Sequence, residues 1–312
     1  MTEALKKKLS DPAVSIVARP APAAPVFVSG GPDALALRAG TVLNIAGTEL
    51  AFEADLPIDI AGRLQPGTDI MLALDAANRV LALELDPATT MPVLGGLHYA
   101  PGGNATARAG GDEVPAVNPC SIWDVGFRPA CADPRGMAYV AGVPGSAGVA
   151  PFWADIYLCA SDHLAGTSRF GATIADGGDP PEKPGGGKRY ARFDYETAQT
   201  VLAHHGKGLL SFAEFAAAAY GVTERSAAGR DPKTCGLDAP RTSRCGVMQA
   251  SGNLYVWGHD GDPDSPRASL FGGSWSSDEF AGSRFASVDD WPDTSSEWLG
   301  ARGRSDHLQL DA

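Results

Sequence analysis

The sequence predicts an α+β protein in which a small N-terminal β module precedes a larger domain with two helices and short strands. Three observations support this prediction. Apolar and polar residues alternate between turn signals over residues 25–88, two clear helix patterns stand within 194–221, and the chain contains 38 glycines and 24 prolines. Alternation is typical of half-buried strands, and frequent glycine and proline favour loops and short strands over long helices.

The N-terminal region divides into an arm and the β module. Residues 1–24, rich in proline and alanine from Ala18 onward, are expected to form a tether. In residues 25–88, turn signals such as Gln65-Pro66-Gly67 separate short alternating runs. The chain then becomes loop-rich with isolated aromatic residues, so we expect a second domain over residues 90–312.

Both helices of the second domain carry start and stop signals. Asp194 is placed to cap a helix that Gly206 ends. Ser211 and Glu214 form an S-x-x-E capping box that opens a second helix, and Gly221 closes it.

Residues 271–308 alternate glycine-rich motifs with large aromatic and acidic side chains. Arg284 and Arg302 are expected to donate hydrogen bonds to loop carbonyls or carboxylates and so fix the loop shape. A surface that is rigid before contact loses less entropy on binding, and aromatic side chains supply contact area with few rotamers. We therefore expect a contact surface made of Trp275, Ser276, Asp278, Phe280, Phe285, Ser287, Asp289, Asp290, Trp291, Asp293 and Trp298.

Core packing is the alternative role for the tryptophans. Trp123 and Trp257 have apolar neighbours and are predicted to be buried. Trp298 precedes an apolar strand, which favours the core, whereas Trp275 suits either role. Trp291 lies between acids and a proline and is the expected exposed anchor. The acids of the segment serve either solubility or contact with a cationic receptor patch or sugar hydroxyls.

Composition excludes several classes of function. The formal net charge is −12, which leaves no basic face for a nucleic-acid partner. Lys6-Lys7-Lys8 is not followed by an apolar run, so no secretory signal is predicted. No apolar run approaches the roughly 20 residues that span a bilayer, so membrane insertion is not expected.

Cysteine spacing gives no metal motif. The five cysteines contain no C-x-x-C pair, which argues against structural zinc. Cys235 and Cys245 lie close enough in sequence to pair across a loop, and two buried free thiols are the alternative. His204-His205 ends the first predicted helix and is expected to cap or pack rather than bind metal.

Three alternating acids, Asp260, Asp262 and Asp264, suggest a calcium loop. Ser265 and Phe271 stand where an EF-hand requires glycine and glutamate, so the motif is incomplete. No cofactor is predicted, and a calcium ion here would only stabilise the loop.

An ordered series of motifs runs through the second domain: WDVGFRPACADPRGMAYVAG, FWADIYL, HHGKGLLSFAEFAAAAYG, SGNLYVWG, FGGSW, AGSR and GARGRSDHL. Over roughly residues 90–312 this series resembles phage major tropism determinants and related tail-fibre receptor-binding proteins. Their C-type-lectin-type fold is shared with formylglycine-generating enzymes.

The resemblance implies a homotrimeric receptor-binding protein with a C-type-lectin-type domain over residues 90–312, displayed on the surface of a phage or phage-derived particle. Residues 1–88 would serve trimerisation and attachment to other tail or capsid proteins. The partner would be a host cell-surface protein or polysaccharide. The chain would be made in the host cytoplasm and reach the particle without a signal peptide.

Three other functions compete with this expectation. Formylglycine chemistry uses cysteines near the C-terminal groove, but the last cysteine is Cys245. A polysaccharide-degrading enzyme needs two carboxylates at a fixed separation, whereas Asp289 and Asp290 are adjacent and point apart on an extended chain. We therefore expect a non-enzymatic adhesin. A decoration protein without a receptor is the structural alternative, and it would tolerate changes to the candidate surface without loss of adsorption.

Overall fold

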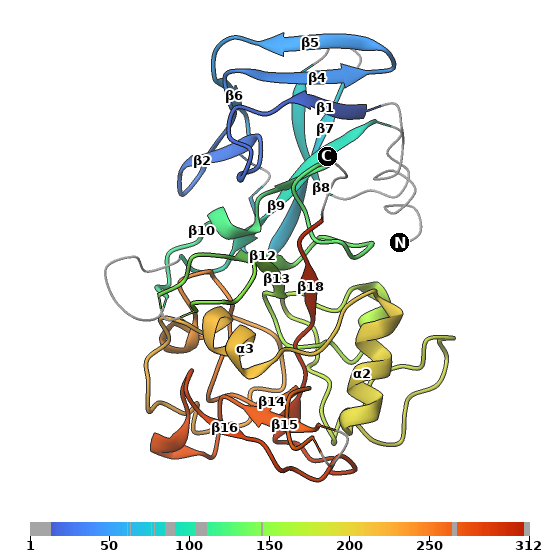
Figure 1. The fold of residues 1–312 in the computed structure, drawn as a ribbon, viewed down its shortest axis with the longest axis vertical. Coiled ribbons are helices and arrows are strands. Elements are labelled where there is room, and N and C mark those ends of the chain that lie inside the picture. Colours follow the sequence, from blue (N-terminus) through green and yellow to red (C-terminus); the bar gives the residue numbers. More distant parts are fainter. Residues whose placement is uncertain are drawn as a thin grey trace.

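A computed structural model describes residues 14–308, with gaps at 61, 63, 76, 78, 85–90, 104–110, 145 and 264–266. The described chain forms two stacked parts: a β-rich N-terminal part and a C-terminal part that carries the helices (Figure 1). Residues 1–13 of the predicted arm lie outside the described residues. Across the described ranges, no helix is long and apolar enough to cross a bilayer.

The N-terminal part consists of three sheets with strand orders β1-β4-β5, β2-β3-β6 and β10-β9-β7-β8, and β11 also pairs with β9. Apolar residues from these strands point inward and form one core. The strands are β1 (Val14–Ala18), β2 (Phe27–Gly31), β3 (Ala34–Leu37), β4 (Thr41–Ile45), β5 (Thr48–Phe52), β6 (Leu56–Ile58), β7 (Thr68–Leu74), β8 (Val80–Glu84), β9 (Val93–Ala100), β10 (Ala116–Val117) and β11 (Trp123–Asp124).

Two segments that were expected outside the β module pair with its strands. Strand β1 lies within the expected arm but pairs with β4. Strand β9 follows the expected boundary at residues 88–90, yet it pairs with β7. Every residue of β9 is buried, so the strand shows no alternation, and Gly95 and Gly96 let Trp123 pack directly against it. The sheet therefore continues to residue 124.

The C-terminal part contains both predicted helices, α2 (Tyr195–His204) and α3 (Phe212–Ala218). The Asp194 carboxylate accepts the backbone N–H of Thr197, and Ser211 and Glu214 form the reciprocal bonds of a capping box. Helix α3 ends at Ala218, before the predicted stop.

Short strands build the rest of the C-terminal part. One sheet has the order β12-β13-β18 and the other β16-β15-β14-β17, in which β14 and β17 run parallel. The strands are β12 (Met137–Val140), β13 (Phe152–Asp155), β14 (Tyr255–Gly258), β15 (Ser269–Phe271), β16 (Ala286–Ser287), β17 (Leu299–Gly300) and β18 (Arg304–Asp306). Short 3₁₀ helices are η1 (Pro119–Ser121), η2 (His163–Ala165), η3 (Ala239–Arg241) and η4 (Asp278–Phe280).

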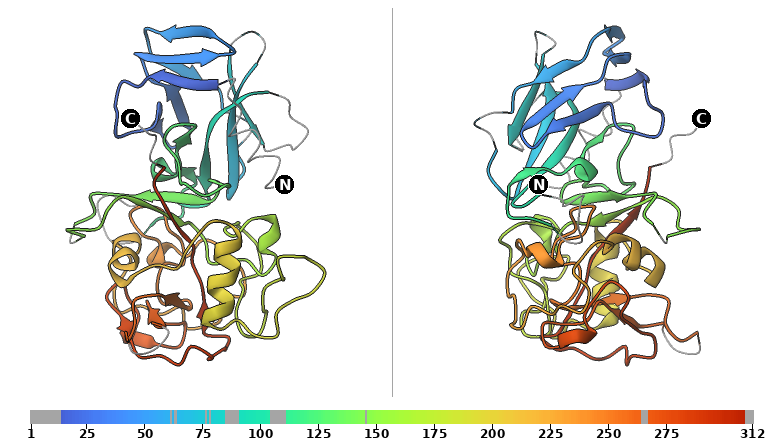
Figure 2. Two further views of the ribbon diagram at one scale, coloured as in Figure 1. Left: turned by 45° about the vertical axis from the view of Figure 1, so that its right-hand side comes forward. Right: turned by 90° about the vertical axis from the view of Figure 1, so that its left-hand side faces the viewer.

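The two parts stack on one another (Figure 2), and specific polar contacts join them. The ring of His98 lies between Asp69 and the hydroxyl of Tyr157, 2.9 Å from each. His98 and Asp69 belong to the N-terminal sheets, whereas Tyr157 follows β13. The ring of Phe170 also packs against Gly67, where a Cβ atom would lie 2.3 Å from the ring. The junction is therefore closely packed.

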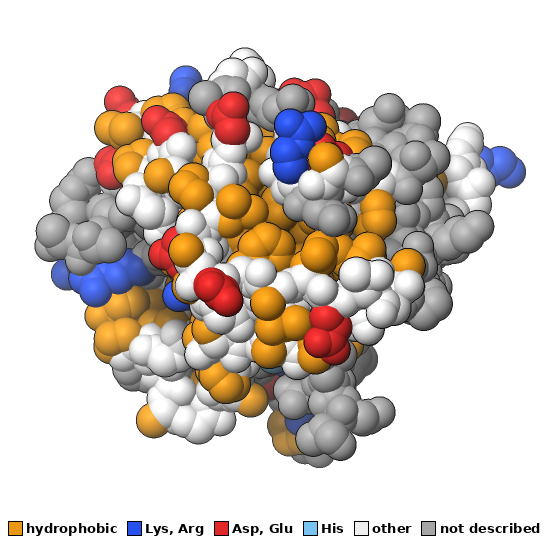
Figure 3. Space-filling model, turned by 90° about the horizontal axis from the view of Figure 1, so that it is seen from above, with side chains coloured by type: hydrophobic (Ala, Val, Ile, Leu, Met, Phe, Trp, Pro, Cys, Tyr) orange, Lys and Arg blue, Asp and Glu red, His pale blue; other side chains and the backbone are white. Residues whose placement is uncertain are grey.

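The N-terminal end of the molecule is apolar over much of its face (Figure 3). Several apolar strand residues in this part are only partly buried, among them Ile16, Ile45 and Phe52. Val17 has 52% of its surface exposed. A face of this kind is typical of a surface that contacts another protein.

Candidate functional site

The C-terminal segment is anchored from inside by Arg302. This fully buried side chain donates hydrogen bonds of 2.7 to 3.0 Å to the carbonyls of Asp155, Ile156, Met248 and Gln249. Burial lowers the pKa of Arg302 to about 10, so the guanidinium stays charged at neutral pH. The expectation that Arg302 fixes loop shape through carbonyls is confirmed.

Gly272 and Gly273 make the turn that opens the outer loop. Both have positive φ, 87° and 75°, a region that favours glycine. A Cβ on Gly272 would lie 2.8 Å from the ring of Phe215, and one on Gly273 would lie 2.8 Å from the Cα of Ala281. Two non-glycine residues at this turn would therefore strain the backbone and clash with the core.

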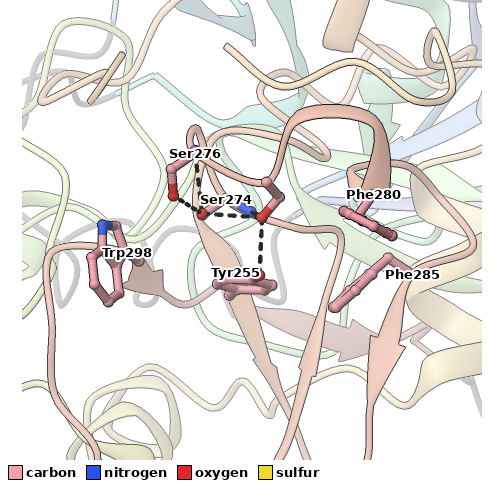
Figure 4. A pocket seen from close by; sticks show the side chains of 7 residues that line it. Tyr255, Ser274, Ser276, Phe280, Phe285 and Trp298 are labelled. Carbon is pink, nitrogen blue, oxygen red and sulfur yellow. Dashed lines mark hydrogen bonds between the residues drawn. The ribbon is translucent and has the colours of Figure 1, made fainter. Parts of the chain in front are cut away.

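A pocket of about 450 Å³ lies directly beyond this turn, open to the surface (Figure 4). Its walls are mostly aromatic and its floor carries hydroxyl groups. The lining residues are Tyr255, Ser274, Ser276, Ser277, Phe280, Phe285 and Trp298.

Hydroxyl groups on the pocket floor form a connected network. The Oγ of Ser277 donates to the phenol oxygen of Tyr255 at 2.9 Å and lies 3.2 Å from the Oγ of Ser274. The backbone N–H of Ser274 in turn donates to Ser277 at 2.9 Å. This network fixes the floor, while the rings of Tyr255 and Phe285 lie 5.6 Å apart beside it. An aromatic wall with nearby hydroxyls suits an apolar side chain or the face of a sugar ring.

A second groove of about 440 Å³ shares Phe280 and Phe285 with the pocket. Glu279 pairs with Arg225 on its rim, and Glu224 accepts hydrogen bonds from the backbone N–H and hydroxyl of Ser283. Arg284 is exposed and has no hydrogen-bond or ion-pair partner among the described residues. The prediction that Arg284 fixes the loop is therefore wrong.

Exposure distinguishes the predicted aromatic residues. Trp291 is 78% exposed, Phe280 70% and Trp298 46%. The exposure of Trp291 is as predicted, but the expectation that Trp298 packs in the core is wrong, because its ring forms a pocket wall. Trp123 and Trp257 are buried, as predicted.

The structure brings some of the predicted residues together and leaves others apart. Those that line the pocket are Ser276, Phe280, Phe285 and Trp298. The others lie outside it: the exposed Asp278, Asp289, Trp291 and Asp293, and the partly buried Trp275, Ser287 and Asp290. The indole N–H of Trp275 and one carboxylate oxygen of Asp290 are shielded from solvent without a hydrogen-bond partner among the described residues.

Sequence reasoning missed three lining residues, Tyr255, Ser274 and Ser277. Tyr255 stands in the SGNLYVWG motif, where every other residue is buried. The motif shows no regular alternation of buried and exposed residues, so no local signal marked Tyr255 as a pocket residue.

Of the three acids whose spacing suggested calcium, Asp260 is engaged in hydrogen bonds within the protein. Asp260 accepts the backbone N–H of Phe212 at 2.8 Å, and Asp264 lies outside the described residues. Within the described ranges, no group of three or more histidine, cysteine or acidic side chains is arranged to hold a metal ion.

Comparison with known proteins relates this geometry to a binding function. The family description "Mtd second domain" matches residues 25–124. The chain is 38% identical to the "Tail fiber receptor-binding protein" of Bordetella phage BPP-1, over 91% of this chain and 83% of that protein. The chain thus belongs to a family of phage tail-fibre receptor-binding proteins.

Solved structures give the same relationship. The "Major Tropism Determinant U1 Variant" superimposes with a TM-score of 0.84 at 35% identity, over 95% of this chain and 86% of that one. The I1 variant gives 0.84 at 36% identity, over 95% and 87%. The likeness therefore extends beyond residues 90–312, where the motifs had placed it, into the N-terminal sheets.

Proposed function

We propose that this chain is the receptor-binding adhesin of a phage or phage-derived particle, and that residues 274–298 together with Tyr255 contact the host receptor. The observation that carries the site assignment is the exposure of Trp291, Phe280 and Trp298 on a loop whose inner side is fixed. Exposed aromatic residues on a rigid scaffold are typical of binding hot spots. The family membership supports the role itself.

The proposal extends to the assembly. The C-terminal part would be a C-type-lectin-type domain, and three copies would associate through the N-terminal part. The apolar N-terminal face would serve trimerisation or attachment to other tail or capsid proteins of the virion. The receptor would be a cell-surface protein or polysaccharide, because aromatic walls with hydroxyl groups suit both. The action would be binding rather than catalysis.

A cell-binding assay tests the site. Purified chain is labelled and its binding to susceptible cells is compared with that of Phe280→Ala/Trp298→Ala and of Trp291→Ala/Asp290→Ala. We expect each double variant to bind at least about 30-fold more weakly, equivalent to about 2 kcal/mol for one lost hot spot. Val114→Ser, which changes a 64% exposed side chain in the N-terminal part, is the matched control and should bind normally.

Two outcomes would redirect the proposal. Normal binding by both double variants would remove the site assignment and leave the adhesin role intact. Failure of the unaltered chain to bind any susceptible cell would favour the decoration protein. Binding that is lost on protease-treated cells indicates a protein receptor, and binding that is lost on capsule-deficient cells indicates a polysaccharide.

A further inference from the structure

Two cysteine thiols meet at the junction of the two parts of the molecule. Cys120 lies in η1, which follows the N-terminal strand β10, and Cys245 lies in a loop of the C-terminal part. The two side chains hydrogen-bond to each other, and Cys120 packs against the core cluster that contains Cys245. The pairing of Cys235 with Cys245, which the sequence left open, is not formed, because both are free thiols.

Asn118 holds the two cysteines in place. Its side-chain oxygen accepts the backbone N–H of Cys120 at 3.0 Å, while its side-chain nitrogen donates to the carbonyl of Cys245 at 3.1 Å. One amide group therefore fixes both backbones across the junction. The two cysteines are thereby kept adjacent, which a disulfide between them requires.

The other cysteines lack such a partner. The thiol of Cys235 donates to the carbonyl of Leu158, and that of Cys159 to the carbonyl of Ala160. Cys131 contacts the sulfur of Met137 and a backbone carbonyl. These three side chains are buried, whereas Cys120 is partly accessible.

We propose that Cys120 and Cys245 form a disulfide bond under oxidising conditions, which joins the N-terminal sheets covalently to the C-terminal part. The oxidant is a low-molecular-weight disulfide such as glutathione disulfide. The Cys120 thiolate attacks one sulfur of the oxidant, forms a mixed disulfide and releases one glutathione thiolate. Cys245 then loses its proton and attacks the Cys120 sulfur, and the second glutathione leaves.

The pKa values of the two thiols differ in the direction that this order of reactions requires. The hydrogen bond from Cys245 lowers the pKa of Cys120, while the same bond and burial raise the pKa of Cys245. The accessible thiol is therefore the one that ionises first and acts as the nucleophile. Cys245 reacts second, within a complex that already holds it beside its target.

Thiol counting on the full chain tests the proposal. The reduced protein is treated with glutathione disulfide at pH 8, unfolded in denaturant and titrated with a thiol reagent. Five thiols should fall to three, since two of the five cysteines are consumed. Peptide mapping without reduction should find Cys120 linked to Cys245. The melting temperature should rise by roughly 5 °C and return on reduction, because the bond closes a long loop.

Three variants separate the possible outcomes. Cys245→Ser should stop at a glutathione adduct on Cys120, and Cys120→Ser should keep its four thiols. Cys235→Ser, which retains a donor to Leu158, is the matched control, and its thiol count should fall from four to two. A wild-type chain that remains folded with five thiols, stops at the adduct, or links another pair would overturn the proposal. This test does not depend on host binding.

Discussion

Arg302 and Arg284 each follow a small residue within a glycine-bearing motif, yet they occupy opposite environments. Arg302 is buried and donates to four backbone carbonyls, whereas Arg284 is exposed without a partner among the described residues. The same contrast separates the inner strands, residues 299–306, from the outer loop, residues 274–298. The outer surface is therefore shaped from inside, by bonds to backbone atoms, and its exposed aromatic side chains remain available for contact.

The inner region also contains a buried ion pair. The ammonium of Lys207 lies 2.5 Å from a carboxylate oxygen of Asp155 and 2.6 Å from the hydroxyl of Thr167, and all three side chains are buried. The backbone N–H of Gly303 donates to the same carboxylate at 3.2 Å. A buried pair needs such additional hydrogen bonds to offset the cost of removing both charges from water.

The strongest test of the contrast is the removal of the inner arginine. Arg302→Met should destabilise the protein by about 3 to 5 kcal/mol. The substitution leaves buried carbonyls without a hydrogen-bond donor and removes a positive charge near Asp155. Chemical denaturation would measure this change. The exposed Arg284→Met serves as the control and should change the free energy of unfolding by less than about 0.5 kcal/mol. Equal changes in the free energy of unfolding would show that Arg302 and Arg284 contribute alike to the fold and would contradict the proposed contrast.

The glycine turn between the two regions gives the next largest effect. Gly273→Ala should destabilise by about 1 to 3 kcal/mol through its positive φ and its approach to Ala281. Gly148→Ala has a similar φ of 87° but no atom within 4 Å of its added Cβ, so it isolates the backbone contribution. A smaller loss in Gly273→Ala than in Gly148→Ala would show that the close packing is unimportant.

Low pH should reduce the free energy of unfolding through two histidines beside α2. His163 and His205 hydrogen-bond at 2.8 Å, and His163 donates its other ring N–H to the carbonyl of Glu182. Burial lowers the pKa of both rings, which favours their neutral forms. Burial, with the nearby Lys207, lowers the pKa of His205 to about 3.

The unfolded chain binds a proton near pH 6.5, whereas folded His205 does not, so stability falls as the pH drops below about 6.5. We expect His205 to account for about 1 kcal/mol of the loss at pH 5, measured by denaturant unfolding at both pH values. His205→Gln should reduce the difference between pH 7 and pH 5. An unchanged difference in this variant would contradict the assignment.

The smallest stability effect is expected on the outer loop. Trp291→Ala should change the free energy of unfolding by less than about 0.5 kcal/mol, since 78% of the side chain is exposed. The buried Trp257→Ala should lose about 3 to 5 kcal/mol in the same thermal and denaturant assays. A large loss in Trp291→Ala would indicate that this residue supports the fold.

The sequence allowed some of these features to be predicted because their signals are local. The capping residues of α2 and α3 lie within four residues of the groups they bind, and alternation marked the strands of the N-terminal module. The sequence did not place β9 in the N-terminal module, because this strand is buried on both faces and its pairing with β7 involves residues distant in the chain. Tertiary pairing leaves no local pattern to detect.

The binding surface was predicted in part for the same reason. Glycine turns and aromatic residues identified residues 271–298, but the inward or outward direction of each side chain depends on contacts from distant segments. Trp298 points into an open pocket rather than the core, and Tyr255 joins that pocket from β14. The contact between Cys120 and Cys245 likewise joins residues 125 positions apart in the chain.

Strand β18 pairs with β13, although about 150 residues separate Arg304 from its partner Ala154. Together with Arg302, this strand is synthesised after every loop that it supports. A product that terminates at residue 301 would contain all the exposed aromatic residues but neither the central arginine nor the closing strand. Incomplete chains are thus expected to reach proteases and chaperones rather than the assembled particle.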